Sequence, residues 1–183
     1  MTCIVLDRDG VINEDSSDYI KSAEEWIPIE GSLEAIATLT ASGYRVAIAT
    51  NQSGLARELF DEYALANIHQ KLRASVEDMG GFVEGIFYCP HGPDESCSCR
   101  KPGTGLLTRI EQELGVCLAG RAFVGDSLTD LKAAQSFHMR AVLVRTGKGA
   151  KTERQLQSLT DSAVEIFDSL ADFVSAETSS KHA

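Results

Sequence analysis

Short runs of apolar residues alternate along the chain with longer segments in which apolar side chains recur every three or four positions. The runs hold only four to six residues and are rich in β-branched side chains, so each predicts a buried strand. The longer segments predict amphipathic helices. We expect strands at residues 2–6, 44–49, 83–88, 121–124, 141–144 and 164–167, and helices at 31–42, 61–79, 105–114, 128–136 and from 168 onward.

This alternation indicates the fold class. Strands that are apolar throughout and are separated by helices are typical of a parallel sheet covered on both faces. The sequence therefore predicts a three-layer, Rossmann-like α/β fold with a central parallel sheet. With 183 residues and no repeat or low-complexity linker, the chain is expected to form a single domain, 1–183. Its end, about 177–183, is polar, and we expect a disordered tail there.

A polar cluster follows at once after four of the predicted strands. These clusters begin at Asp7, Thr50, Cys89 and Asp126. In open parallel sheets, ligands bind beyond the carboxyl ends of the strands. We therefore expect the four clusters to meet at one functional site.

Composition limits which partners that site can have. The chain carries 27 acidic and 17 basic residues, a formal net charge of -10, which disfavours a nucleic-acid or anionic membrane surface. It begins without the pattern of a signal peptide, and no apolar run approaches the ~20 residues of a membrane span. Three of the five cysteines crowd into residues 89–99, which indicates metal ligation in a reducing cytoplasm rather than disulfides.

Two pairs of carboxylates are candidate metal ligands. Asp7 and Asp9 stand two residues apart at the mouth of a predicted strand, where they would repel each other unless a cation lay between them. Mg²⁺ prefers such oxygen ligands. Asp126 follows another strand in the same way, whereas Asp130, in the first turn of a helix, is also explained by the helix dipole. Taken alone, the pair Asp7 and Asp9 also fits a solvated acidic turn.

Two further segments offer groups that bind phosphate. Residues 50–54 read Thr-Asn-Gln-Ser-Gly and supply a hydroxyl, amides and exposed backbone N–H groups. Arg100 and Lys101 supply local cations, the first as a planar fork and the second as a point charge. A polar turn and a solubilising surface are the alternatives for these segments.

The four segments, in this order and spacing, resemble the motifs of the haloacid dehalogenase (HAD) phosphatase superfamily over nearly the whole chain. The resemblance implies that Asp7 attacks phosphorus and forms an aspartyl-phosphate. Asp9 would protonate the leaving oxygen and later take a proton from water. Thr50 and Lys101 would hold the phosphoryl group. Mg²⁺ would be bound by the carboxylates of Asp7 and Asp126 and by the backbone carbonyl of Asp9.

The cysteine cluster has the spacing of a structural zinc site. Cys89, His91, Cys97 and Cys99 form a C-x-H-x5-C-x-C pattern, whose three thiolates and one imidazole match a closed tetrahedral Zn²⁺ site. Zinc would stiffen the loop 89–99 and hold the two basic residues that follow it over the active site. Free cysteines in a loop are the alternative.

The intervals between motifs are too short for a large cap domain, so we expect a capless enzyme with an open cleft. Capless relatives with such a clip resemble two groups, which act on a heptose 1,7-bisphosphate and on histidinol phosphate. Ser53, where the histidinol enzymes usually have Asp, favours the heptose group. That resemblance implies removal of the C7 phosphate from the sugar, for activated heptose and lipopolysaccharide core synthesis. Histidinol phosphate is the alternative substrate.

A binding module with a vestigial site is the alternative outside enzymes, and the presence of Asp7, Asp9 and Asp126 argues against it. We expect a monomer, solvated side chains at His69 and His138, and a solvated His182 in the tail. Cys3 and Cys117 are expected to be small core residues. By the resemblance, Arg100 joins the catalytic group, and the substrate contacts Asp15, Ser16, Ser17, Asp18, Thr50, Asn51, Gln52, Ser53, Arg100, Lys101 and Ser127.

Overall fold

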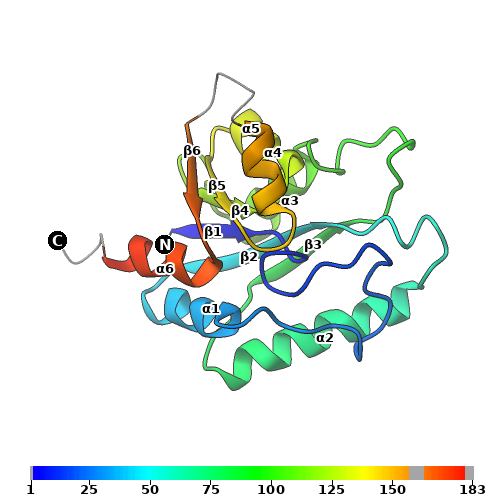
Figure 1. Cartoon of the computed structure of the whole chain (residues 1–183), viewed down its shortest axis with the longest axis horizontal. Helices are drawn as coiled ribbons and strands as arrows, with labels where there is room; N and C mark the ends of the chain where they lie inside the picture. The colour runs from blue at the N-terminus through cyan, green and yellow to red at the C-terminus, as the bar shows by residue number, and fades with distance from the viewer. Residues whose placement is uncertain (1, 157–162, 180–183) are drawn as a thin grey trace.

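Strands and helices alternate through the part of the chain that the computed structural model describes, residues 2–156 and 163–179 (Figure 1). The strands are β1 (Cys3–Leu6), β2 (Arg45–Asn51), β3 (Gly85–Cys89), β4 (Ala122–Gly125), β5 (Arg140–Val144) and β6 (Val164–Phe167). The helices are α1 (Ser32–Ala41), α2 (Glu62–Asp78), α3 (Gly105–Leu114), α4 (Leu128–Ser136), α5 (Gly149–Leu156) and α6 (Leu170–Ser179).

The strands form one parallel sheet in the order β3-β2-β1-β4-β5-β6, which confirms the predicted fold class. β1 lies in the middle of the sheet. Leu6, at its end, pairs with Ile48 of β2 on one side and with Val124 of β4 on the other. The loops that leave these three strands therefore begin side by side at the same edge of the sheet.

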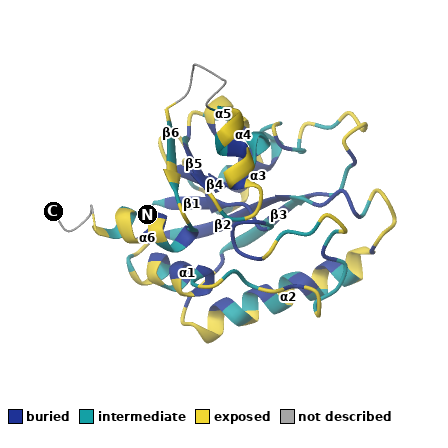
Figure 2. Ribbon diagram, in the orientation of Figure 1, coloured by how far each residue is buried: buried dark blue, intermediate teal, exposed yellow. Residues whose placement is uncertain are grey.

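Helices cover both faces of the sheet (Figure 1). α1, α2 and α6 lie on one face, and α3, α4 and α5 lie on the other. Because successive strand residues point to opposite faces, Ile4 and Leu6 pack into one apolar cluster and Cys3 and Val5 into the other. Figure 2 shows the resulting buried layer along the central strands.

Several element boundaries differ from the prediction. α5 was not predicted, because its sequence is mostly polar and lacks an apolar repeat. The predicted disordered tail is wrong for residues 177–179, because α6 runs to Ser179 and the Glu177 carboxylate lies 3.0 Å from the Arg140 guanidinium. Residues 180–183, and His182 with them, lie outside the described residues.

The two cysteines outside the cluster differ from each other. Cys3 is buried in β1, as predicted, whereas Cys117 is exposed in the loop that follows α3, so its core assignment is wrong. Across the ranges that the structure describes, every helix falls short of the length and apolar character needed to cross a bilayer.

Candidate active site

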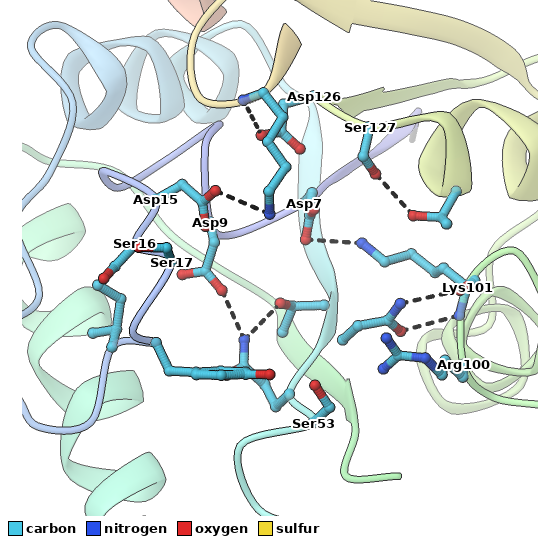
Figure 3. Close-up of a pocket in the computed structure, with 17 residues that line it drawn as sticks. Asp7, Asp9, Asp15, Ser16, Ser17, Ser53, Arg100, Lys101, Asp126 and Ser127 are labelled. Atoms are coloured by element: carbon cyan, nitrogen blue, oxygen red, sulfur yellow. Dashed lines mark hydrogen bonds and ion pairs between the residues drawn. The ribbon is translucent and has the colours of Figure 1, made fainter. Parts of the chain in front are cut away.

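The loops at the carboxyl ends of the strands enclose a cleft of about 420 Å³ (Figure 3). Its floor is formed by residues that follow β1 and β4 and by the last residues of β2, and its walls by the segments after β2 and β3 and the loops after β1 and β5. The lining residues are Asp7, Asp9, Asp15, Ser16, Ser17, Tyr19, Ile20, Thr50, Asn51, Gln52, Ser53, Arg100, Lys101, Asp126, Ser127, Thr129 and Lys148.

This lining contains the residues that the sequence analysis assigned to catalysis, to Mg²⁺ and to substrate, with one difference. Asp18 is exposed outside the lining, and its backbone carbonyl accepts a hydrogen bond from Lys21 Nζ at 2.9 Å. Residues separated by more than 100 positions in the sequence thus meet in one cleft. The parallel sheet brings them together, since each lies at the carboxyl end of a strand or in the segment that follows it.

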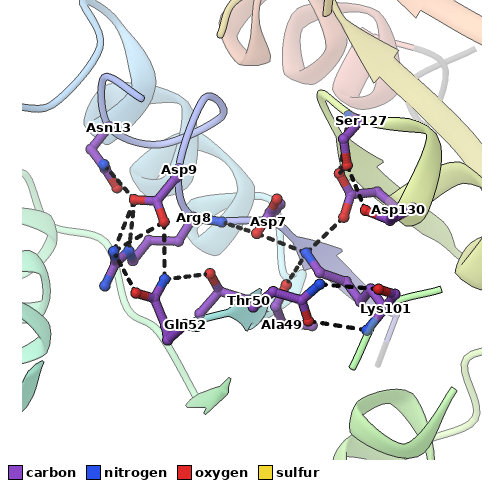
Figure 4. Close-up of polar contacts among 12 residues, drawn as sticks. Asp7, Arg8, Asp9, Asn13, Ala49, Thr50, Gln52, Lys101, Ser127 and Asp130 are labelled. Atoms are coloured by element: carbon purple, nitrogen blue, oxygen red, sulfur yellow. Dashed lines mark hydrogen bonds and ion pairs between the residues drawn. The ribbon is translucent and has the colours of Figure 1, made fainter. Parts of the chain in front are cut away.

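Lys101 is the central cation of the cleft floor (Figure 4). Its buried Nζ lies 2.8 Å from Asp7 Oδ1 and 2.6 Å from Asp130 Oδ1, and it donates to the backbone carbonyl of Ala49 at 2.8 Å. Burial opposes the charged ammonium, but the Asp130 and Asp7 carboxylates outweigh it and raise the pKa of Lys101. Lys101 is therefore a fixed positive charge beside the Asp7 carboxylate.

Asn51, at the end of β2, fixes the backbone of this lysine. Its Oδ1 accepts from Lys101 N at 3.0 Å, and its Nδ2 donates to Lys101 O at 3.1 Å. The amide thus satisfies both backbone groups of Lys101, and the segment after the cysteine cluster is tied to the central sheet.

Asp130 makes specific contacts that go beyond an interaction with the helix dipole. Its Oδ2 accepts from the backbone N–H of Ser127 at 3.1 Å and from the Ser127 hydroxyl at 2.6 Å, at the start of α4. Its other oxygen contacts Lys101. One buried carboxylate therefore caps the helix and anchors the cation of the cleft.

Asp7 and Asp126 face the same point of the cleft, and their carboxylate oxygens and one from Asp130 lie within 4.8 Å of one another. Burial and the neighbouring Asp130 raise the pKa of Asp7, and the same two causes raise the pKa of Asp126 to about 7. Carboxylates crowded in this way are stabilised as anions by a cation, so the donor set fits a divalent metal ion.

The backbone at Gly10 and Gly147 lies directly against the Asp126 carboxylate. A side chain at Gly10, whose φ is +81°, would overlap the Asp126 carboxylate, and one at Gly147 would do the same. Asp126 Oδ2 also accepts from the backbone N–H of Lys148 at 2.8 Å. Glycine is required at both positions because the loops after β1 and β5 converge on one carboxylate.

The Asp9 side chain points away from Asp7 into a second polar cluster (Figure 4). Arg8 Nε and Nη2 each donate to it at 3.0 Å, Asn13 Nδ2 donates at 2.8 Å, and Gln52 Nε2 donates at 2.9 Å. Burial raises the pKa of Asp9, but Arg8 and the two amides outweigh it and hold the pKa below its ordinary value.

The cysteine cluster forms as predicted at the end of β3. The ligand atoms of Cys89, His91, Cys97 and Cys99 lie within 4.8 Å of one another. The Cys89–Cys97 and Cys97–Cys99 sulfur pairs are 3.8 and 3.7 Å apart, and the Cys99–Cys89 pair is 3.2 Å apart. A tetrahedral Zn²⁺ with bonds of about 2.3 Å places sulfurs about 3.8 Å apart, so two of the three separations match.

Arg100 is the first residue after this cluster and contacts it directly. Its Nη1 donates to the backbone carbonyl of His91 at 3.1 Å. The cluster and the cleft therefore share a wall, in which one side chain of the lining is hydrogen-bonded to the backbone of a candidate zinc ligand.

Several residues of the site were not predicted from the sequence: Tyr19, Ile20 and Thr129 of the lining, and also Lys148, Arg8 and His69. Lys148 lines the cleft, and its Nζ lies 2.9 Å from Asp15 Oδ2; its position just after β5 was the available indication. Arg8 is buried against Asp9. His69 contacts Arg8 Nη1 at 3.3 Å, so its assignment as a solvated side chain is wrong.

Comparison with known proteins finds relatives that match nearly the whole chain. The HAD-hydrolase-like family profile matches residues 98–173. A D-glycero-β-D-manno-heptose-1,7-bisphosphate 7-phosphatase from Pseudomonas aeruginosa is 52% identical over 173 residues, which cover 94% of this chain and 96% of that protein. The enzyme of the same name from Neisseria meningitidis is 44% identical, over 94% of this chain and 92% of its own.

A solved structure is also similar over the full length of both chains. It is the crystal structure of D,D-heptose 1,7-bisphosphate phosphatase from Bordetella bronchiseptica, complexed with magnesium and phosphate. The TM-score is 0.92 and the sequence identity is 46%, with 100% of each chain covered.

Proposed function

Because the chain belongs to the HAD-like hydrolases, in the family of D-glycero-β-D-manno-heptose-1,7-bisphosphate 7-phosphatases, we propose that it removes the C7 phosphate of D-glycero-β-D-manno-heptose 1,7-bisphosphate. The observation that carries this proposal is the meeting of Asp7, Thr50, Lys101 and Asp126 in one cleft. The product, a heptose 1-phosphate, suits the synthesis of nucleotide-activated heptose for surface glycans such as the lipopolysaccharide core.

The cleft residues divide the reaction into two displacements. An Asp7 oxygen attacks phosphorus, and the bond from phosphorus to O7 of the sugar breaks. Asp9, whose pKa lies below its ordinary value before substrate binds, takes up a proton when the anionic substrate arrives and gives that proton to the departing oxygen. Water then attacks the aspartyl-phosphate and passes a proton to Asp9, and phosphate leaves as Asp7 is regenerated. Two steps with a held nucleophile replace one very slow attack by water.

The transferring phosphoryl group needs positioning and charge neutralisation more than covalent chemistry. Lys101 supplies a fixed positive charge at the nucleophile, and the Thr50 hydroxyl is held by Gln52 Nε2 at 2.9 Å. Mg²⁺ would be held by the carboxylates of Asp7 and Asp126 and by the backbone carbonyl of Asp9. When bound, it would neutralise charge on the phosphoryl oxygens.

The sugar and its second phosphate would lie toward the outer cleft. Asp15, Ser16, Ser17, Ser53 and Ser127 offer hydroxyls and carboxylates to a polyhydroxylated substrate. Arg100 and Lys148 are the cations of this outer part, and each reaches the cleft from a different loop. An acidic chain of net charge -10 can thus receive an anionic sugar because its cations gather at the site.

The cysteine cluster is proposed as a structural Zn²⁺ site that holds the Arg100–Lys101 segment. Its four protein ligands would leave no position for water, which is the arrangement of a structural zinc. The five free cysteines of the chain support a location in the reducing cytoplasm. A monomer is proposed as the working form, because the sequence has no coiled-coil or other obvious pairing segment.

The test is phosphate release in the presence of Mg²⁺ from the β and α anomers of heptose 1,7-bisphosphate and from histidinol phosphate, side by side. The β anomer is expected to be preferred, and Asp7→Asn is expected to abolish release while the protein stays folded. Preference for histidinol phosphate would overturn the substrate assignment and leave the chemistry standing. Activity retained in Asp7→Asn would overturn the nucleophile assignment.

A further inference from the structure

Arg8 is a buried cation that the two-step reaction does not use. It stands between Asp7 and Asp9 in the sequence and is 1% exposed. Two edges of its guanidinium are engaged. Nε and Nη2 face the Asp9 carboxylate, and Nη2 also donates to Gln52 Oε1 at 3.2 Å. A buried guanidinium requires hydrogen-bond acceptors for its N–H groups. Besides Asp9 and Gln52, a third acceptor lies on α2.

That partner is His69, on the sheet-facing side of α2. Its Nε2 lies 3.3 Å from Arg8 Nη1. Since a guanidinium can only donate, Nε2 must accept, and a neutral imidazole then carries its proton on Nδ1. Burial and the positive charge of Arg8 lower the pKa of His69 to about 3, which agrees with this assignment. Its ring is also held by Tyr88, at 5.8 Å between centroids.

The planar geometry of the guanidinium connects the His69 contact to the contacts that Arg8 makes with Asp9. The group is a rigid plane, so a hydrogen bond that fixes Nη1 also fixes the directions in which Nε and Nη2 point. Those two nitrogens are the ones that bind Asp9. α2 thus contacts, through His69, the guanidinium that binds Asp9, while Asn13 and Gln52 bind the same carboxylate from the loops after β1 and β2.

We propose that His69 is a positioning residue, which acts through Arg8 to orient Asp9 toward the leaving oxygen of the substrate. The inference rests on the proposed function, in which Asp9 protonates that oxygen. A misdirected acid slows only those substrates whose leaving group needs a proton. A sugar alkoxide needs one, whereas p-nitrophenolate leaves without it.

The experiment measures kcat/KM of the Mg²⁺-loaded, full-length His69→Phe variant with heptose 1,7-bisphosphate and with p-nitrophenyl phosphate. Phe keeps a ring against Tyr88 but offers no acceptor to Arg8. We expect the ratio of the two values, sugar over aryl, to fall about tenfold, because general acid catalysis contributes at least that much. The ratio is independent of the fraction of folded protein, so partial unfolding does not obscure it.

Two variants complete the design. His69→Gln restores an acceptor, and its ratio should lie within about twofold of the wild-type value, since a shared hydrogen bond is kept. Gln70→Leu, at the exposed neighbouring position of α2, should leave the ratio unchanged. An unchanged ratio in His69→Phe, or the same fall in His69→Gln, would overturn the inference.

Asp9→Asn separates this inference from the function on which it rests. If Asp9→Asn lowers the ratio and His69→Phe does not, the positioning role fails alone. If neither variant lowers the ratio, the acid role proposed for Asp9 fails, and the positioning role fails with it.

Discussion

The ammonium of Lys101 lies between the carboxylates of Asp7 and Asp130, and all three groups are buried. A buried ion pair contributes little net stability, but removing one partner leaves a charge without compensation. We therefore interpret Asp130 as the counter-charge that shares Lys101 with Asp7 and leaves the Asp7 carboxylate available for its proposed attack on phosphorus.

We expect Asp130→Asn to lower the free energy of unfolding by about 3 kcal/mol, the cost of breaking a buried pair. Phosphate release should also slow, because Lys101 would then bind Asp7 as its single carboxylate partner. The amide still offers an acceptor to Ser127, so the helix cap is kept. Urea unfolding and phosphate release measure the two effects.

Asp172→Asn is the matched control for this prediction. Asp172 accepts from the Ser169 hydroxyl at 2.6 Å, the same distance and spacing as Asp130 and Ser127, but it is exposed. Its loss should cost less than about 0.5 kcal/mol. Equal losses in both variants would show that capping, and not the pairing with Lys101, explains Asp130.

The stability of the protein should depend on pH through His69. Burial and Arg8 lower its pKa to about 3 in the folded chain, against an ordinary value of 6.5. Between these values the unfolded chain binds the extra proton, so this contribution to stability is full above pH 6.5 and is lost as the pH falls. Near pH 5 the loss is at most roughly 2 kcal/mol.

His69→Gln, which does not titrate, should therefore lose less stability than the wild type between about pH 7 and about pH 5. Urea unfolding at the two pH values measures the difference. His138→Gln, at an exposed histidine, should follow the wild type. Parallel losses in the wild type and His69→Gln would contradict the lowered pKa.

At the scale of single residues, the sequence predicted residues whose chemistry follows from their type and from their place at or just after the end of a strand. Asp7, Thr50 and Asp126 are of this kind, and the structure places all three in the lining of one cleft. Arg8 and His69 are not of this kind, because their role arises from a contact between residues 61 positions apart. A lone arginine and a lone histidine on a helix carry no local pattern that distinguishes them from surface residues.

At the scale of the elements, the loops after β1 and β5 both approach Asp126 so closely that neither Gly10 nor Gly147 has room for a side chain. We expect Gly10→Ala to lose most Mg²⁺-dependent activity, because the added methyl group would displace the Asp126 carboxylate. Activity as a function of Mg²⁺ concentration measures this loss. The backbone itself would also be strained, since its φ is +81°.

Gly43→Ala separates the effect of displacing the Asp126 carboxylate from the effect of backbone strain. Gly43 has a φ of +78°, and a side chain there would meet nothing within 4 Å. Both variants should lose about 1 kcal/mol of stability from backbone strain, but Gly43→Ala should keep its activity. If both variants kept full activity, the close approach to Asp126 would have no functional consequence.

The conformation of the loop that holds the cysteine cluster should depend on the proposed zinc ion. Cys97→Ala is expected to lose bound zinc and to lower kcat/KM roughly tenfold to a hundredfold, because a small displacement of Arg100 and Lys101 misplaces the substrate. Metal analysis and phosphate release measure both. Cys117→Ala, at an exposed cysteine outside the cluster, should change neither. Zinc retained in full by Cys97→Ala would contradict the four-ligand site.

For the whole molecule, the parallel sheet was predictable because its strands are apolar on both faces. α5 was missed, since a short polar helix has no apolar repeat to detect. The order of the strands was not predicted either, because an apolar run does not specify which neighbour it pairs with. The position of β1 in the middle of the sheet is therefore information that the structure adds.

The central position of β1 has a consequence for how the protein unfolds and loses activity. β1 is hydrogen-bonded on both sides, and the backbone N–H of Asp7 continues the ladder to Val124 O at 2.8 Å. Edge strands can fray while the middle of a sheet stays closed, so the Asp7 amide should exchange its hydrogen for deuterium only on global unfolding. Heat or denaturant should then inactivate the enzyme in one cooperative step, with no folded species in which Asp7, the proposed nucleophile, has left the cleft.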